Sequence, residues 1–160
     1  MTDGTPLTIR RLFPADVPLM QAMTRMFGEA FDQPEEYGGL SPSHDYLERL
    51  LARDAFIALV AVQGDAVVGG LVAYELEKFE RERREIYIYD LAVAEAHRRQ
   101  GIATGLIEEL RRIGAERGAW VIFVQADYGD DPAIALYEKL GKREEVLHFD
   151  IRVRLSRRPV

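Results

Sequence analysis

The chain has 160 residues, a formal net charge of −6, and 48% hydrophobic and 30% charged residues, which is ordinary for a globular protein. This length suits one domain over residues 1–160, and the absence of cysteine excludes disulfides, thiolate metal sites and cysteine nucleophiles. An acidic chain argues against unspecific nucleic-acid binding and is compatible with a cationic substrate. Without a signal-peptide pattern or a bilayer-spanning apolar run, we expect a cytoplasmic protein with no membrane partner.

The first third of the chain predicts one strand followed by two helices. Residues 7–12 have the composition of a strand, and Asp16 marks the start of a helix. Apolar residues, several of them methionine, then recur at helical spacing as far as Phe31. A core-facing helix explains this stripe, and a pliable ligand surface is the alternative. Turn-forming and acidic residues at 32–39 predict a loop, after which Ser43 caps a second helix.

A β-hairpin is predicted next, because the strand-like runs 56–62 and 67–76 are separated by a turn signal. Gly69 and Gly70 in the second run suggest a bulge or a close approach of another element. The mixed charges at 78–85 are typical of a solvated loop.

Residues 85–104 combine a strand with an anion-binding turn. The strand is mostly apolar but contains one carboxylate, Asp90. The basic turn His97–Gln100 follows, and Gly101 opens an amphipathic helix. The first backbone N–H groups of a helix have no intrahelical partner, and the helix dipole adds positive charge there. We therefore expect this turn to bind phosphate groups.

The remainder predicts a helix, a strand, a second helix and a last strand. The first helix has an apolar face from 102 to 113, and the run 120–126 is typical of a strand buried on both faces. Asp131 can cap the second helix, Gly141 ends it, and 145–155 reads as the last strand. The order βααβββαβαβ implies an α/β fold with a mixed sheet flanked by helices.

Two motifs resemble those of the GNAT acyltransferases. Residues 98–103, RRQGIA, resemble the pyrophosphate-binding motif of that superfamily, and residues 133–141, AIALYEKLG, resemble its second signature. The resemblance implies the GNAT fold and acetyl-CoA as co-substrate. The three histidines show no spacing typical of metal ligands, so we expect no metal. The cofactor-binding residues that it implies are Leu91, Ala92, Val93, Arg98, Arg99, Gln100, Gly101, Ile102, Ala103, Thr104 and Tyr137.

A closer resemblance is to the aminoglycoside 3-N-acetyltransferases that give gentamicin resistance. It is carried by residues 88–93, 120–132 and 146–150, and it continues back through 78–80 and 30–32. It implies acetylation of the 3-amino group of aminoglycosides by direct attack in a ternary complex. Aminoglycosides are polycations, so several carboxylates are expected round the acceptor site. The candidates are Glu36, Asp90, Asp127, Asp130 and Asp150. The oligomeric state is not fixed by the sequence, and a homodimer stays open.

Asp90 and Tyr137 are the candidate catalytic residues. The resemblance makes Asp90 the base or the anchor of the acceptor amine, and the alternative is a carboxylate paired with a nearby arginine. It places Tyr137 near the departing thiolate, which a phenol can protonate, and the alternative is a core aromatic residue. Each of the other four acids has the alternative of a surface residue or a cap.

Two departures from the superfamily pattern are visible. Asp131 stands where many relatives have asparagine, which favours a helix cap over an amide contact with the pantetheine arm. Ala103 replaces a glycine at the last position of the first motif.

Two rival functions are also compatible with the sequence. One is a GNAT enzyme that acts on another small-molecule or protein amine, and the other is a catalytically silent acyl-CoA-binding sensor.

Overall fold

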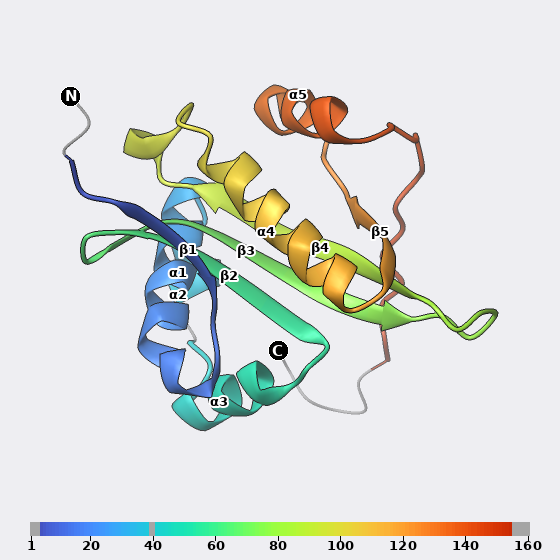
Figure 1. Cartoon of the computed structure of the whole chain (residues 1–160), viewed down its shortest axis with the longest axis horizontal. Coiled ribbons are helices and arrows are strands. Elements are labelled where there is room, and N and C mark those ends of the chain that lie inside the picture. Colours follow the sequence, from blue (N-terminus) through green and yellow to red (C-terminus); the bar gives the residue numbers. More distant parts are fainter. Residues whose placement is uncertain (1–3, 39–40, 155–160) are drawn as a thin grey trace. The chain divides into compact units, whose positions relative to one another are not determined.

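The computed structural model describes residues 4–38 and 41–154, and the chain divides into two compact units, Met1–Gln125 and Ala126–Val160. In the described residues the first unit contains a sheet of five strands in the order β1-β2-β3-β4-β5 (Figure 1). Neighbouring strands are antiparallel except β4 and β5, which are parallel, so the predicted mixed sheet is confirmed. The strands are β1 (Leu7–Arg11), β2 (Phe56–Gln63), β3 (Ala66–Glu77), β4 (Arg84–Val93) and β5 (Ala119–Val124).

Helices accompany the sheet, as predicted. The first unit holds α1 (Val17–Ala30), α2 (Pro34–Gly38), α3 (His44–Ala52) and α4 (Ile102–Glu116), with short 3₁₀ turns at Pro14–Asp16 and Glu95–His97. The second unit holds α5 (Asp131–Leu140). Within the described residues no helix is both long and apolar enough to cross a membrane.

Adjacent glycines let two helices approach opposite faces of the sheet. A Cβ atom added to Gly69 would lie 2.8 Å from Cγ2 of Ile102 on α4, and one added to Gly70 would lie 2.4 Å from Sδ of Met23 on α1. Because successive residues of a strand point to opposite faces, α4 covers one face and α1 the other (Figure 1). The close approach predicted at this glycine pair is confirmed.

The methionine stripe of α1 belongs to the core. Met20, Met23 and Met26 are at most 7% exposed and pack with Phe27 against residues of α3, β2 and β3. The core-facing interpretation is therefore confirmed, and the alternative of a ligand surface is wrong. Burial of these side chains anchors α1 to the sheet through the hydrophobic effect.

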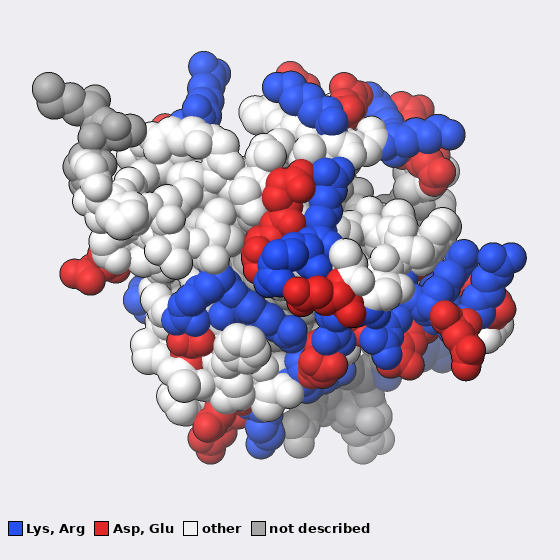
Figure 2. Space-filling view, viewed as in Figure 1, with Lys and Arg blue, Asp and Glu red and all other residues white. Residues whose placement is uncertain are grey.

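The outer face of α4 carries charges of both signs. Arg111 lies 2.7 Å from Glu108, and Arg112 lies 2.6 Å from both Glu109 and Glu116. Figure 2 shows these basic and acidic side chains interspersed along the helix rather than gathered by sign. Exposed pairs of this kind favour a solvated helix face and add little stability.

The loop predicted at residues 32–39 is partly wrong, because Pro34–Gly38 forms α2. Proline is pre-organised for the first turn of a helix, and Glu35 and Glu36 suit the positive end of the helix dipole. Residue 39 lies outside the described residues.

The strand over 120–126 was expected to be buried on both faces, and this is wrong. Among the described strands β5 pairs only with β4, and Trp120 and Phe123 are 57% and 36% exposed. Two of its aromatic side chains make contacts at the surface instead. The guanidinium of Arg83 lies 4.0 Å from the ring centre of Trp120, and Phe123 stacks on Tyr87 with ring centres 4.8 Å apart.

The second unit departs from expectation at two places. Asp130, not Asp131, is the N-cap of α5, because Asp131 already belongs to the helix and the Ala133 N–H donates to the Asp130 carboxylate at 3.4 Å. The strand predicted at 145–155 does not form over 145–154, and residue 155 lies outside the described residues. The apolar side chains of this segment are exposed, and a strand requires a hydrogen-bonded neighbour that no described residue supplies.

Candidate active site

The turn between β4 and α4 has the backbone geometry of an anion-binding site. Arg99 and Gly101 both adopt left-handed conformations, with φ of 62° and 80°. The first helical hydrogen bond runs from the Gly105 N–H to the Gly101 carbonyl at 2.9 Å. The N–H groups of Ile102, Ala103 and Thr104 therefore have no partner within the helix and lie at its positive end. Such a group of donors can hold a phosphate.

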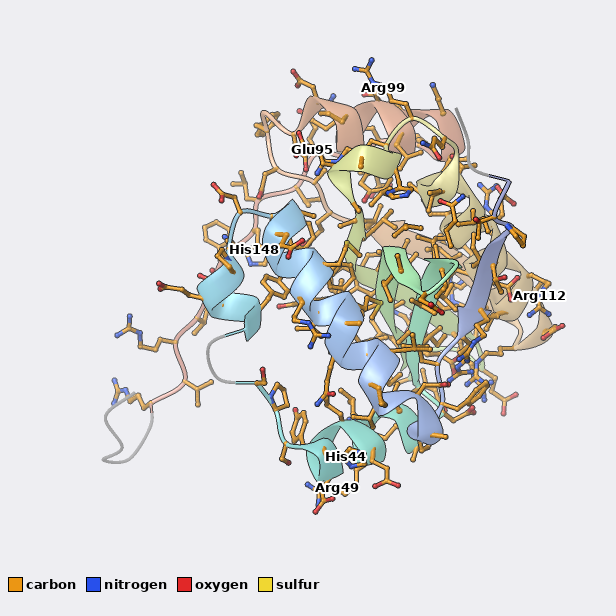
Figure 3. The ribbon with its side chains drawn as sticks, turned by 90° about the vertical axis from the view of Figure 1, so that its left-hand side faces the viewer. His44, Arg49, Glu95, Arg99, Arg112 and His148 are labelled. Atoms are coloured by element: carbon orange, nitrogen blue, oxygen red, sulfur yellow. The ribbon has the colours of Figure 1, made fainter. Side chains whose placement is uncertain are left out.

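The side chains of this turn leave the backbone accessible. A Cβ atom on Gly101 would have no neighbour within 4 Å, and Arg98, Arg99 and Gln100 are exposed. Arg98 Nε donates to the Val93 carbonyl at 3.2 Å, which ties the turn to the end of β4. Figure 3 shows Arg99 and Glu95 together at one end of the first unit.

The outer edge of β4 is open beside this turn. β3 pairs with β4 as far as Val93, but β5 pairs with it only from Arg84 to Ile88. On the β5 side, no described strand pairs with β4 between Tyr89 and Val93. A linear chain of amide groups can bind such an edge as an added strand. The expected pantetheine contact at Leu91–Val93 fits this geometry.

Asp90 lies where the open edge begins. Val72 pairs with Asp90 and Ala73 with Ile88, so Tyr89 has no partner and forms a β-bulge. Bulges bend a strand and redirect the side chains beside them, and they are common next to active sites. The half-buried carboxylate is therefore held at the position where β4 parts from β5.

Tyr37 on α2 is the hydrogen-bond partner of Asp90. Its hydroxyl donates to the carboxylate, with 3.2 Å to Oδ2 and 3.4 Å to Oδ1. Burial raises the pKa of Asp90, and the bond from Tyr37 opposes this shift. Burial and the negative charge of Asp90 raise the pKa of Tyr37 to about 12. No described arginine or lysine forms an ion pair with Asp90, so within the described residues the alternative of a carboxylate paired with arginine is wrong.

Sequence reasoning did not identify Tyr37. The two partners are 53 residues apart, and Tyr37 lay in a stretch predicted to be a loop. Its neighbour Glu36, an expected acceptor ligand, is exposed on α2, where its negative charge acts on Tyr37. Glu36 thus lies beside the Tyr37–Asp90 pair, and its contact with an acceptor stays a prediction.

The other expected acceptor ligands belong to the second unit. Asp130 caps α5, and Asp150 lies 2.9 Å from Nε2 of His148. Asp127 is exposed after β5, and its carbonyl accepts from the Asp130 N–H at 3.2 Å. Cap and ion-pair contacts do not require a ligand, so the roles of these three residues remain predictions.

Tyr137 lies on α5 and is half-buried. Burial and the negative charge of Asp130 raise the pKa of its hydroxyl to about 12. The phenol is therefore protonated at neutral pH and can serve as a proton donor.

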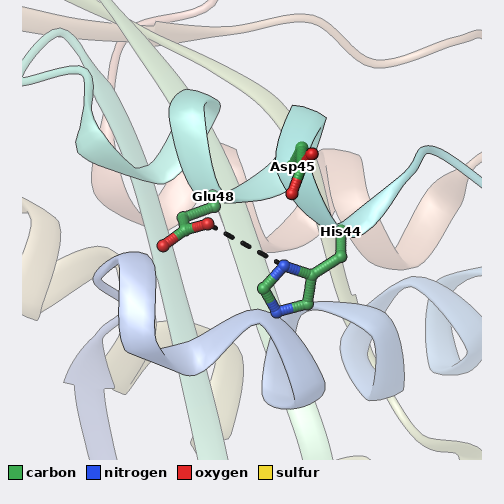
Figure 4. A group of neighbouring side chains, drawn as sticks. All are labelled: His44, Asp45 and Glu48. Atoms are coloured by element: carbon green, nitrogen blue, oxygen red, sulfur yellow. Dashed lines mark ion pairs between the residues drawn. The ribbon is translucent and has the colours of Figure 1, made fainter.

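A cluster of possible metal ligands lies elsewhere. His44, Asp45 and Glu48 are all exposed on α3, and His44 Nδ1 is 3.8 Å from Glu48 Oε2 (Figure 4). Figure 3 shows His44 and Arg49 at the opposite end of the first unit from Arg99. A pair four residues apart is a common feature of exposed helices, so this cluster does not by itself indicate a metal site. The expected absence of a metal stays a prediction.

Comparison with known proteins finds acetyltransferases. The chain matches the model of the acetyltransferase (GNAT) family over residues 20–142. An aminoglycoside acetyltransferase from an uncultured soil metagenomic sample is 60% identical, with a TM-score of 0.92 over 93% of this chain and 99% of that one. A second one, also from a soil metagenomic sample and solved in complex with sisomicin, is 34% identical, with a TM-score of 0.85 over 92% of this chain and 97% of that one.

A curated acetyltransferase with another name also matches. An N-alpha-acetyltransferase of Saccharolobus solfataricus is 30% identical over 122 residues, which is 71% of this chain and 70% of that protein. The family model covers most of the chain, and the expected mixed sheet is present. The protein therefore belongs to the GNAT family of acetyltransferases.

Proposed function

We propose that this protein transfers an acetyl group from acetyl-CoA to the 3-amino group of aminoglycosides such as gentamicin and sisomicin, and so confers resistance to them. The observation that carries this proposal is Asp90, a half-buried carboxylate without a cationic partner among the described residues, beside the open edge of β4. A half-buried carboxylate without a cationic partner favours a cationic amine as its ligand. The two aminoglycoside acetyltransferases among the relatives support the same class of acceptor.

The residues present fit acetyl-CoA. The backbone of Gln100 to Thr104 would hold the pyrophosphate, and Leu91 to Val93 would pair with the pantetheine arm as an added strand. The exposed side chains of Arg98 and Arg99 add positive charge at the same turn. When bound, acetyl-CoA supplies the thioester carbonyl that a free amine attacks.

Asp90 and Tyr137 would handle the protons of this reaction. Asp90 removes one proton from the acceptor ammonium, so the nitrogen lone pair forms the bond to the acetyl carbon while the carbon–sulfur bond breaks. The second proton that the nitrogen loses on becoming an amide passes to solvent. Tyr137 donates its proton to the departing sulfur and regains one from solvent, and Asp90 returns its proton to solvent. Both groups act within one ternary complex, without an acetylated enzyme.

The polycationic acceptor would be held by carboxylates. Asp90 anchors the reacting amine, and Glu36, Asp127, Asp130 and Asp150 are proposed to contact the other ammonium groups. The net charge of −6 favours association with such a cation through the long-range field. A homodimer and a cytoplasmic location stay predictions.

Replacing Gly101 with alanine is expected to weaken acetyl-CoA binding. At φ 80° an L-residue is strained, and relief of that strain would turn the N–H groups of the turn away from the phosphates. We expect the Kd for acetyl-CoA, measured by calorimetry, to rise roughly tenfold, which corresponds to a strain of about 1–2 kcal/mol.

The matched control is Gly64→Ala. Gly64 has a φ of 62° in the hairpin between β2 and β3, so the substitution carries similar strain outside the proposed cofactor site. The control should lower stability and leave acetyl-CoA binding unchanged. Equal affinity of the Gly101→Ala variant and the parent would contradict a phosphate site at this turn.

A thiol-release assay with acetyl-CoA tests the substrate. Sisomicin, gentamicin and kanamycin should support turnover above that of polyamines and peptide N-termini. Turnover with peptides alone would favour the second candidate, an enzyme acting on protein N-termini, which the N-alpha-acetyltransferase relative supports. Acetyl-CoA binding without turnover of any amine, unchanged by Asp90→Asn and Tyr137→Phe, would indicate an acyl-CoA sensor.

A further inference from the structure

Tyr37 and Asp90 form a contact between segments that are distant in the chain. The Tyr37 hydroxyl reaches both carboxylate oxygens, at 3.2 and 3.4 Å. An ionised carboxylate only accepts hydrogen bonds, so the phenol is the donor. A bond to the charged form of an acid favours that form and restricts rotation of the carboxylate.

The position of Tyr37 is set by packing against α1. Its ring centre lies 5.6 Å from that of Phe31 and 6.3 Å from that of Phe27, in tilted and edge-on arrangements. A Cβ atom on Gly28 would lie 3.1 Å from Cβ of Tyr37, so the absence of a side chain there admits the tyrosine. The Tyr37 N–H also donates to the Gln33 carbonyl at 3.3 Å. The hydroxyl is thus held by the end of α1 and by α2 together.

We propose that Tyr37 is a positioning residue, which keeps Asp90 ionised and turns its remaining lone pairs toward the acceptor amine. This inference rests on the proposed function in one respect, the role of Asp90 as the base. It adds that α2, through Tyr37, prepares this base before the acceptor binds. Removal of the hydroxyl alone should therefore impair proton transfer while leaving the cofactor site intact.

Several titratable groups surround Asp90, and the effect of Tyr37 on the pKa of Asp90 has to be separated from theirs. Burial and the negative charge of Asp90 raise the pKa of Tyr74 on β3 and of Tyr87 on β4, so both phenols are neutral in the pH range where a carboxyl group titrates. Burial raises the pKa of Tyr37, and Tyr89 and Glu36 raise it further. Burial raises the pKa of Asp90 and the bond from Tyr37 lowers it. Loss of that bond should raise this pKa further, so that the carboxylate gains its proton at higher pH.

The direct test is an NMR titration of carboxyl-¹³C aspartate in the free protein. In Tyr37→Phe, which keeps the ring and its aromatic contacts, the Asp90 signal should titrate at higher pH than in the parent. The matched control is Tyr87→Phe, whose hydroxyl donates to Oε1 of Gln125 at 2.9 Å rather than to Asp90. This control should leave the titration of Asp90 where it is in the parent. A parallel titration of Glu36→Gln identifies any contribution from the neighbouring acid.

Kinetics with sisomicin supply a second readout. Tyr37→Phe should lower kcat roughly 10- to 100-fold, because a hydrogen bond to a charged group is lost, and should leave KM for acetyl-CoA unchanged. The acid limb of the pH profile should move to higher pH by the same amount as the NMR titration. If the parent acetylates no aminoglycoside, the proposed function fails, and the titration still decides the role of Tyr37.

One result would overturn the inference: a folded Tyr37→Phe protein with the parental titration of Asp90 and the parental acid limb. Tyr37 would then serve packing only. If Tyr37→Phe does not fold, Phe31→Leu provides the test, because it loosens the ring and retains the hydroxyl. The titration of Asp90 should move in the same direction in this variant, by a smaller amount, and no movement would again contradict the inference.

Discussion

Replacing Asp90 with asparagine is expected to lower kcat/KM for aminoglycoside acetylation by about 10²- to 10⁴-fold, the range typical of a lost general base. Asparagine has nearly the same shape, and its amide oxygen can still accept the bond from Tyr37. It cannot take a proton from the acceptor ammonium, and it carries no charge to attract that cation. A thiol-release assay with sisomicin and acetyl-CoA measures the loss.

Two controls separate chemistry from folding in this experiment. Acetyl-CoA should bind the Asp90→Asn variant as tightly as the parent, because the proposed phosphate-binding turn begins beyond Val93. Asp45→Asn removes one exposed carboxylate from α3 and should keep the parental rate. An Asp90→Asn enzyme that retains more than about a tenth of the parental kcat/KM would contradict the assignment of Asp90 as the base.

The second large effect concerns stability and centres on Glu75. The Glu75 side chain is 2% exposed, and Arg117, which follows α4, contacts both of its carboxylate oxygens. Arg84 lies 3.4 Å from the same carboxylate. Arg117→Ala should lower the free energy of unfolding by about 3 kcal/mol, because it leaves a buried charge with only one partner. Urea denaturation at neutral pH measures this change.

Arg112→Ala is the matched control for Arg117→Ala. Its exposed partners Glu109 and Glu116 lie 2.6 Å away on α4, and removal of such pairs should cost less than about 1 kcal/mol. Adding Glu75→Gln to Arg117→Ala should recover part of the lost stability, because the buried group is then neutral. Equal costs for Arg117→Ala and Arg112→Ala would show that burial of Glu75 does not matter.

Features with a local sequence signal were predictable. The apolar spacing of α1 and α4 identified both helices, and Gly64 with Asp65 marked the hairpin between β2 and β3. The turn at the N-terminus of α4 was also predictable, because strand, glycine and helix follow each other without a gap. In each case the residues that determine the structure lie within a few positions of one another.

Features that depend on distant partners were not predictable. α2 has five residues, too few to show a repeating helical pattern, and Tyr37 meets Asp90 only after α1 and β4 have packed. The strand expected at 145–155 alternates correctly, yet alternation does not supply the neighbour that a strand needs. The apolar run of β5 likewise could not show that Trp120 contacts Arg83 at an exposed position.

The central claim is tested most directly by the structure of the product. Sisomicin is incubated with acetyl-CoA and the protein, and the acetylated nitrogen is located by two-dimensional NMR of the purified product. We predict a single acetyl group, on the 3-amino group of the 2-deoxystreptamine ring, and at most about a hundredth as much product from the Asp90→Asn variant in the same time. Acetylation at another amino group, or no acetylated sisomicin from the parent protein, would contradict the central claim.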